Sequence, residues 1–213
     1  VFEGGQPWPT IVQNEGLFVP LQDKNLPVFG EPRDVWRLDP NYAGGNLAYV
    51  VSRVSGPEGH VVVNTKLLAA ADYPMSFHDI ATNPKYRGKI AWCDPKSTGD
   101  VAFKWTLWGY VANAMSLEDV WSIYANQQPV LFPDPVAEAS GVGRGEAAIN
   151  MGTPSFEALA TAGAPIKTLW FPDTPSVITT SGIGALKAAP HPNAALLFVN
   201  WVLSKRGQEV ITD

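Results

Sequence analysis

The segment from Gly88 to Asp100 constrains the fold more than any other part of this sequence. Ile90 to Cys93 reads as a short buried strand, and it ends at Asp94-Pro95 because proline lacks the N–H that a sheet requires. Ser97, Thr98 and Gly99 then precede a helical pattern, where backbone N–H groups are free and the helix dipole is positive. This helix start is either an ordinary cap or a place that binds anions and polar ligands.

Apolar runs typical of strands alternate with helical patterns along most of the chain, which indicates an α/β fold with a largely parallel sheet or sheets. Capping boxes at Ser76–Asp79 and Ser116–Asp119 open two of the helices. Other helices are expected over 8–14, over 101–115, over 133–141, after Thr153-Pro154 and from His191-Pro192. Strands are expected over 46–52, 60–65, 129–132, 146–151, 166–171 and 177–186, with a turn over 55–59 between the first two.

The side chains expected in the core follow from the spacing of apolar residues in these helices. The helix after Asp100 carries one stripe, and the helix after Pro192 carries another made of Ala194, Leu197, Phe198, Trp201 and Val202. Trp105, Trp108 and Trp201 are therefore expected in the core. Trp8 and Trp36 lie in loop-rich stretches, where they either pack locally or line a ligand cleft.

The composition excludes several classes of protein. The 213 residues are 46% hydrophobic and only 16% charged, which is typical of a packed domain or two small lobes. A net charge of −5 without a Lys/Arg run argues against nucleic acid and anionic membranes as partners. Cys93 is the single cysteine, so no internal disulfide forms, and its apolar strand favours a place in the core. No run of about 18 apolar residues occurs, and no signal peptide is visible.

No catalytic or metal-binding constellation is visible in the sequence. His60, His78 and His191 are far apart and form no zinc pattern, so structural roles are expected for them. The glycine-rich run from Gly141 to Glu146 precedes a strand instead of following one, which is the wrong context for a nucleotide loop. No nucleophile elbow is present. The chain is therefore predicted not to be an enzyme and to need no cofactor.

Several motifs, in their order and spacing, resemble the extracellular solute-binding proteins of bacterial ABC transporters, in the branch that includes the ferric-iron binders. The similarity covers essentially the whole chain, and its most distinctive part is the last motif. The matching stretches are Val61 to Thr65, Met75 to Ile80, Gly88 to Trp92 with Asp94-Pro95, Gly145 to Ile149, and His191 to Ala195 continued through Phe198–Ser204 to Gly207-Gln208.

The resemblance implies a type II periplasmic-binding-protein fold, in which two α/β lobes joined by hinge strands close on a ligand held in the cleft between them. Residues 1–64 and 169–213 would form one lobe and 65–168 the other. The first lobe would be incomplete, with its N-terminal part, the export signal and the final helices outside this chain.

The resemblance also implies a ligand site. The helix-start loop that holds a polar or anionic group matches Ser97-Thr98-Gly99, and the facing loop of the other lobe matches Glu3-Gly4-Gly5. Thr153 and Ser155 would donate further hydrogen bonds. The iron binders have two adjacent tyrosines where this chain has Ser155-Phe156, and a hydroxyl and a phenyl ring do not suit ferric iron. Phe156 would stack on the ligand or simply pack.

These matches imply a periplasmic or otherwise extracellular protein, free or lipid-anchored, that captures a small anionic or polar organic solute. It would act as a monomer and deliver the solute to an ABC transporter permease, with no metal in the site. One alternative is a ferric-iron binder that uses other ligands, for which Tyr42, Tyr49 and Tyr73 are available. Others are a ligand-sensing domain of a receptor or regulator, and an enzyme on a similar fold.

Overall fold

The computed structural model describes residues 1–5, 8–32, 50–151, 156–172, 174 and 177–212. The chain divides into a first unit, residues 1–55 with 178–213, and a second unit, residues 56–177. The chain leaves the first unit within β2 (Val50–Glu58) and returns to it at the start of β8 (Val177–Gly184). The lobe boundaries expected from the sequence were 64/65 and 168/169. The difference arises because residues 60–64 and 166–170 pair within the sheet of the second unit.

The sheet of the second unit has the order β5-β4-β6-β3-β7. Its strands are β3 (His60–Asn64), β4 (Ile90–Cys93), β5 (Val130–Phe132), β6 (Ile149–Asn150) and β7 (Ile166–Trp170). β4 runs parallel to β5 and β6, whereas β3 is antiparallel to both of its neighbours, β6 and β7. The strands that follow helical connections, β4, β5, β6 and β7, therefore run in the same direction, and β3 runs in the opposite direction.

The antiparallel direction of β3 has a local cause in the chain. β2 extends through Glu58, and Gly59 is the single residue between it and β3. The predicted turn over residues 55–59 is therefore wrong, and β3 enters the second sheet directly from β2 without a helical crossover. Gly59 has a φ of 108°, which only glycine adopts easily. The expectation of a largely parallel arrangement is correct for the strands of the second unit that follow helices. In the first unit, however, β1 and β8 are antiparallel.

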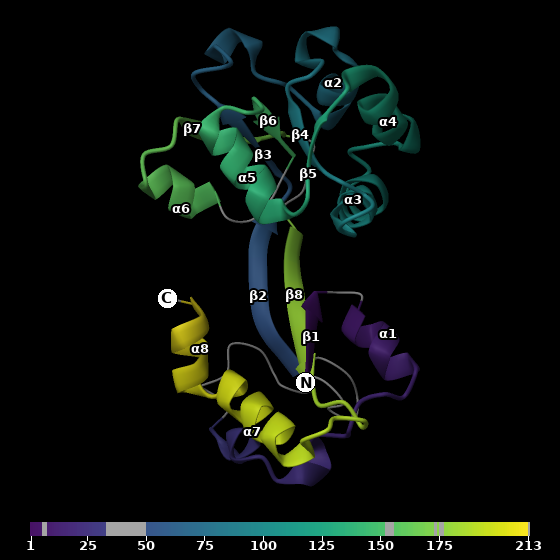
Figure 1. Cartoon of the computed structure of the whole chain (residues 1–213), viewed down its shortest axis with the longest axis vertical. Helices are drawn as coiled ribbons and strands as arrows, with labels where there is room; N and C mark the ends of the chain where they lie inside the picture. Colours follow the sequence, from purple (N-terminus) through teal and green to yellow (C-terminus); the bar gives the residue numbers. More distant parts are fainter. Residues whose placement is uncertain (6–7, 33–49, 152–155, 173, 175–176, 213) are drawn as a thin grey trace. The chain divides into compact units, whose positions relative to one another are not determined.

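Helices cover both faces of this sheet (Figure 1). Alternate residues of a strand point to opposite faces, so each strand contributes side chains to a core on each side. On one face, Val61, Val63 and Trp92 join a core with α2 (Phe77–Thr82), α4 (Leu117–Ser122) and the turn Thr106–Val111. On the other face, Val62 and Ala91 pack with α5 (Pro135–Arg144) and α6 (Phe156–Thr161). The second unit is therefore a three-layer α/β/α structure.

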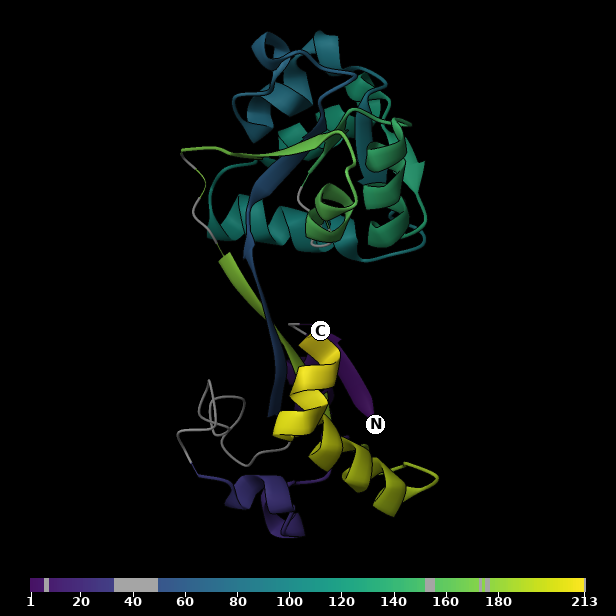
Figure 2. The same cartoon turned by 90° about the vertical axis from the view of Figure 1, so that its left-hand side faces the viewer.

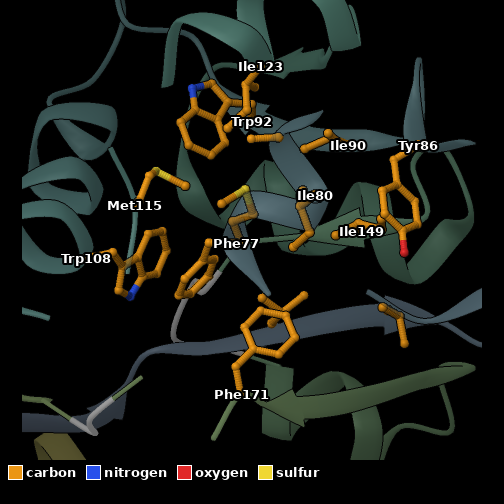
Figure 3. Close-up of a cluster of buried hydrophobic side chains, with 14 of the residues drawn as sticks. Phe77, Ile80, Tyr86, Ile90, Trp92, Trp108, Met115, Ile123, Ile149 and Phe171 are labelled. Carbon is orange, nitrogen blue, oxygen red and sulfur yellow. The ribbon is translucent and has the colours of Figure 1, made fainter. Parts of the chain in front are cut away.

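Aromatic rings fill the centre of the larger core (Figure 3). Phe77 stacks on Trp108 with ring centroids 4.6 Å apart, and Phe171 meets Phe77 edge-on at 5.2 Å. Trp108 is buried as predicted, whereas Trp105 is half-buried at the edge of the same cluster. These contacts join α2 to the helical segment after Asp100. They therefore hold the helices on this face of the sheet to one another as well as to the sheet.

The predicted capping residues open their helices. Ser116 accepts from the N–H of Asp119, whose carboxylate accepts from the N–H of Ser116, which completes a reciprocal box. Ser76 accepts from the N–H of Asp79 in the same way, but that carboxylate accepts instead from the N–H of Met75. The helix expected over 101–115 is α3 (Asp100–Trp105) followed by a wider π-helical turn, Thr106–Val111. α4 also continues as a π-helical turn, Ile123–Gln127.

The first unit has a smaller sheet, with the order β1-β8-β2. β1 (Phe2–Gly5) lies antiparallel to β8, and α1 (Trp8–Asn14) follows β1. Two short 3-10 helices follow, Gln22–Lys24 and Pro27–Gly30, and the second packs against α7 (Pro192–Leu203). α7 leads into α8 (Lys205–Thr212). Figure 2 shows α7 and α8 in yellow, one after the other with a bend between them.

The buried face of α7 differs from the predicted one. Ala195, Val199, Val202 and Leu203 are buried in the core of the first unit, whereas Leu197, Phe198 and Trp201 are 70%, 48% and 39% exposed. The prediction of Trp201 as a core residue is therefore wrong. Apolar residues occur nearly all round this helix, so their spacing alone does not identify which side packs.

Candidate functional site

The segment Asp94–Gly99 forms a tight turn between β4 and α3. The carbonyl of Asp94 accepts from the N–H groups of Ser97 and Thr98 at 3.0 and 3.2 Å, and the Asp94 carboxylate accepts from the N–H of Lys96 at 2.9 Å. α3 begins directly afterwards at Asp100. The predicted strand, loop and helix start are therefore present, and the loop is fixed by its own hydrogen bonds.

The side chains of the three predicted loop residues are not equivalent. The Ser97 hydroxyl lies 2.8 Å from the carbonyl of Pro133 and 3.0 Å from that of Asp94, so its single proton is shared between backbone acceptors. The Thr98 hydroxyl oxygen accepts weakly from the N–H of Asp100 at 3.4 Å, and its proton has no acceptor in the described part of the chain. Gly99 is exposed and faces open space. Thr98 and Gly99 are thus the open positions, and Ser97 fastens the loop.

A buried ionic cluster lies directly behind this loop. Lys104 Nζ is 2.7 Å from the Asp100 carboxylate and 3.1 and 3.2 Å from the two oxygens of Glu138. The side chains of Lys104 and Glu138 are 1% and 0% exposed. Nζ also lies 5.3 Å from the ring centre of Trp92. Burial alone would lower the pKa of Lys104, but the charges of Glu138 and Asp100 outweigh it and raise that pKa, so the ammonium stays protonated.

Cys93 completes the cluster, in which the Lys104 ammonium occupies the place that a cation would take. Its buried thiol donates to Glu138 at 2.9 Å, and burial followed by the Glu138 charge raises the pKa of the thiol far above its usual value. The thiol is therefore unreactive. Ligand atoms of Cys93, Asp100 and Glu138 lie within 4.8 Å of one another, a spacing that suits a metal ion. The Lys104 ammonium, however, already supplies the positive charge between the two carboxylates.

The sequence did not single out Lys104, Asp100 or Glu138. Asp100 and Lys104 stand four residues apart on one helix, a spacing that predicts an ion pair. Nothing in the sequence indicates that Glu138, on another helix, would join them. A shallow hollow in the first unit, lined by Gln22, Asn25, Leu26, Pro27, Phe29 and Gly30, contains none of the predicted site residues.

The other predicted contacts fall in different places. Glu3, Gly4 and Gly5 belong to β1 of the first unit, where they pair with Ile183, Gly182 and Ser181, so they form a strand and not the expected loop. Thr153 and Ser155 lie outside the described residues, as do Trp36, Tyr42, Tyr49 and the side chain of Trp8. The contact of all these positions with a ligand stays a prediction.

The remaining described candidates are occupied in structural contacts. His78 Nδ1 lies 2.7 Å from the Asp119 carboxylate, His60 packs on Trp170, and His191 precedes α7. Tyr73 is half-buried, and the ammonium of Lys167 lies 5.4 Å from its ring centre. Phe156 is 5% exposed and packs in the core beside α5, so it packs instead of stacking on a ligand.

The chain belongs to the family of bacterial extracellular solute-binding proteins, whose sequence model matches residues 5–213. The family consists of binding proteins, which confirms the prediction that the chain is not an enzyme. A Haemophilus influenzae protein described as uncharacterized is 30% identical over 191 residues. That match covers 79% of this chain and 54% of the relative, so the chain spans about half the relative's length.

Solved structures show the same fold. The periplasmic binding protein AfuA from Actinobacillus pleuropneumoniae, with fructose-6-phosphate bound, gives a TM-score of 0.68 at 24% identity, over 94% of this chain and 61% of AfuA. Iron-bound HitA from Pseudomonas aeruginosa gives 0.64 at 20% identity, over 94% and 62%. These similarities confirm the predicted type II periplasmic-binding-protein fold class. No helix among the described residues is long and apolar enough to cross a bilayer.

Proposed function

We propose that this chain captures a small anionic or polar organic solute for an ABC importer. The segment Ser97–Gly99 would hold one side of the solute, and Glu3–Gly5 with Thr153 and Ser155 would contribute the others. The protein would act as a monomer outside the cytoplasm, in the periplasm or tethered by a lipid, and would deliver its solute to a permease. Membership of an extracellular solute-binding family supports this role.

The observation that supports an anionic or polar ligand is a set of unpaired backbone N–H donors at the start of α3. Within the described residues, the backbone N–H groups of Gly99, Val101 and Ala102 have no acceptor, and the Thr98 hydroxyl is beside them. Such donors at a helix start favour an oxyanion, because the partial positive charge of the helix end adds to the hydrogen bonds. AfuA, which has the same fold, is known with a sugar phosphate bound.

Ferric iron is less well supported as the ligand. HitA binds iron on this fold, but hard ferric iron requires oxygen ligands such as phenolates. At the position where the iron binders of this branch have adjacent tyrosines, the chain has Ser155 and Phe156, and Phe156 is buried in an apolar core. Tyr73 is half-buried and pairs with Lys167.

Binding of organic anions tests this proposal directly. Fructose 6-phosphate, other sugar phosphates, small carboxylates, inorganic phosphate and ferric citrate are titrated into the protein by isothermal calorimetry. We expect at least one organic anion to bind saturably and to raise the melting temperature, because a ligand stabilises the state that binds it. Binding of ferric iron alone would contradict the proposal.

The Thr98→Val variant tests the position of the site. It removes the open hydroxyl while keeping the shape of the side chain, and a lost hydrogen bond to a charged ligand is worth about 1–3 kcal/mol. The dissociation constant should therefore rise roughly 5- to 150-fold. Thr82→Val is the matched control, since the Thr82 hydroxyl donates to a backbone carbonyl in α2. Equal affinities for the two variants would place the site elsewhere.

A further inference from the structure

The buried ionic cluster joins the two elements that flank the open loop. Asp100 is the first residue of α3 and follows Gly99 directly, whereas Glu138 lies in the first turn of α5. Lys104 contacts both carboxylates, at 2.7 Å and at 3.1–3.2 Å. The ammonium therefore ties the start of α3 to the start of α5.

A second link lies on the other side of the loop. The Ser97 hydroxyl contacts the carbonyl of Pro133, two residues before α5 begins. Thr98 and Gly99 stand between this link and the Asp100–Lys104–Glu138 link. Both ends of the short open stretch are thus fastened to the same neighbouring segment, residues 133–138, while the stretch itself remains free to contact a solute.

The chemistry of the cluster fits positioning better than simple stabilisation. Burying an ammonium and two carboxylates carries a large desolvation cost, and apolar side chains of similar volume often stabilise a core as well or better. Hydrogen-bonded charges differ from apolar contacts in fixing direction and distance. Lys104 donates two such hydrogen bonds to Glu138 from a side chain that is 1% exposed, and the same ammonium forms an ion pair of 2.7 Å with the Asp100 carboxylate. The ammonium is thus fixed by Glu138 and attracts Asp100 toward it.

We propose that Lys104 is a positioning residue of the solute site. By bridging Asp100 and Glu138, it fixes the start of α3 and so keeps the donors of Thr98, Gly99, Val101 and Ala102 in place. Lys104 acts through the loop and does not touch the solute. This inference rests on the proposed function, because that function assigns solute binding to the loop. The effect of Lys104 on the rigidity of the loop can nevertheless be measured without any ligand.

The variant Lys104→Met/Glu138→Met separates positioning from stability. It replaces the buried Lys104–Glu138 pair by apolar side chains and leaves Asp100, whose side chain is 14% exposed, as the one charge of the cluster. The melting temperature should therefore fall much less than in Lys104→Met, which leaves the fully buried Glu138 carboxylate unpaired. We expect the backbone amides of residues 98–102 to exchange with solvent at least about 10-fold faster, because the loop opens locally more often. Amides in β3 and β4 should keep their protection. The affinity for fructose 6-phosphate should fall in parallel with the loop protection.

The matched control is Arg144→Met/Glu146→Met, which removes an ion pair whose side chains are 60% and 48% exposed. It should change neither exchange nor affinity. Parental exchange at residues 98–102 in the folded Lys104→Met/Glu138→Met protein would overturn the inference. If that variant does not fold, Asp100→Asn loosens the same link while keeping the Lys104–Glu138 pair. Unchanged exchange there would overturn the inference equally. If no organic anion binds the parent, the proposed function fails while the exchange rates still decide the role of Lys104.

Discussion

The single variant Lys104→Met is expected to lower the free energy of unfolding by about 3–5 kcal/mol at neutral pH. It leaves Glu138, whose side chain is 0% exposed, without the ammonium that neutralises it. Glu138 would keep the hydrogen bond from the Cys93 thiol, but no opposite charge would balance its buried carboxylate. Lys66→Met, at an exposed lysine, is the control and should change stability by no more than about 0.5 kcal/mol.

The loss of stability in Lys104→Met should depend on pH in one direction, which the pKa of Glu138 determines. Burial raises the pKa of Glu138 above its ordinary value, and the Lys104 charge opposes that shift. Without Lys104, the pKa of Glu138 in the folded state rises further above its value in the unfolded chain. Stability is then lost as the pH rises through the interval between the two pKa values. Urea unfolding should therefore show a deficit that shrinks from about pH 8 to about pH 5, and a deficit of constant size would contradict this account.

Trp108→Ala is expected to lower the free energy of unfolding of the second unit by a similar amount. Trp108 is 1% exposed and stacks on Phe77 in the largest core, so truncation leaves a cavity that the surrounding rings cannot fill (Figure 3). Such large-to-small changes destabilise by about 3–5 kcal/mol.

Trp121→Ala is the matched control for the core variant, because it makes the same chemical change at a tryptophan that is 64% exposed. Urea unfolding of the two variants should separate by more than about 2 kcal/mol. Equal losses would mean that the ring of Trp108 does not pack as described.

Local signals in the sequence predicted most of the elements. Ser76 and Ser116 open their helices, and a helix begins at His191-Pro192 as predicted. The strand from Ile90 to Cys93 ends where Asp94-Pro95 required it to end. These predictions succeed because a cap or a proline acts on its own neighbours and needs no tertiary information.

Predictions that depend on distant contacts were less successful. The apolar residues of α7 do not reveal that Val199 packs inward while Leu197 is exposed, since the choice depends on what the helix meets. The ion pair of Lys104 with Glu138 joins residues 34 positions apart, beyond the range of any local pattern. The hydrogen bond from the Ser97 hydroxyl to the carbonyl of Pro133 likewise joins residues 36 positions apart, while the contact of Ser97 with a ligand stays a prediction.

The bound species itself tests the central claim most directly. Native mass spectrometry of the protein, expressed from its whole gene and purified without denaturation, measures the mass of any small molecule that co-purifies. We predict the mass of one anionic or polar organic compound, which is lost on unfolding and whose rebinding is weakened by Thr98→Val. A protein that carries only iron, with visible charge-transfer colour, would contradict the account.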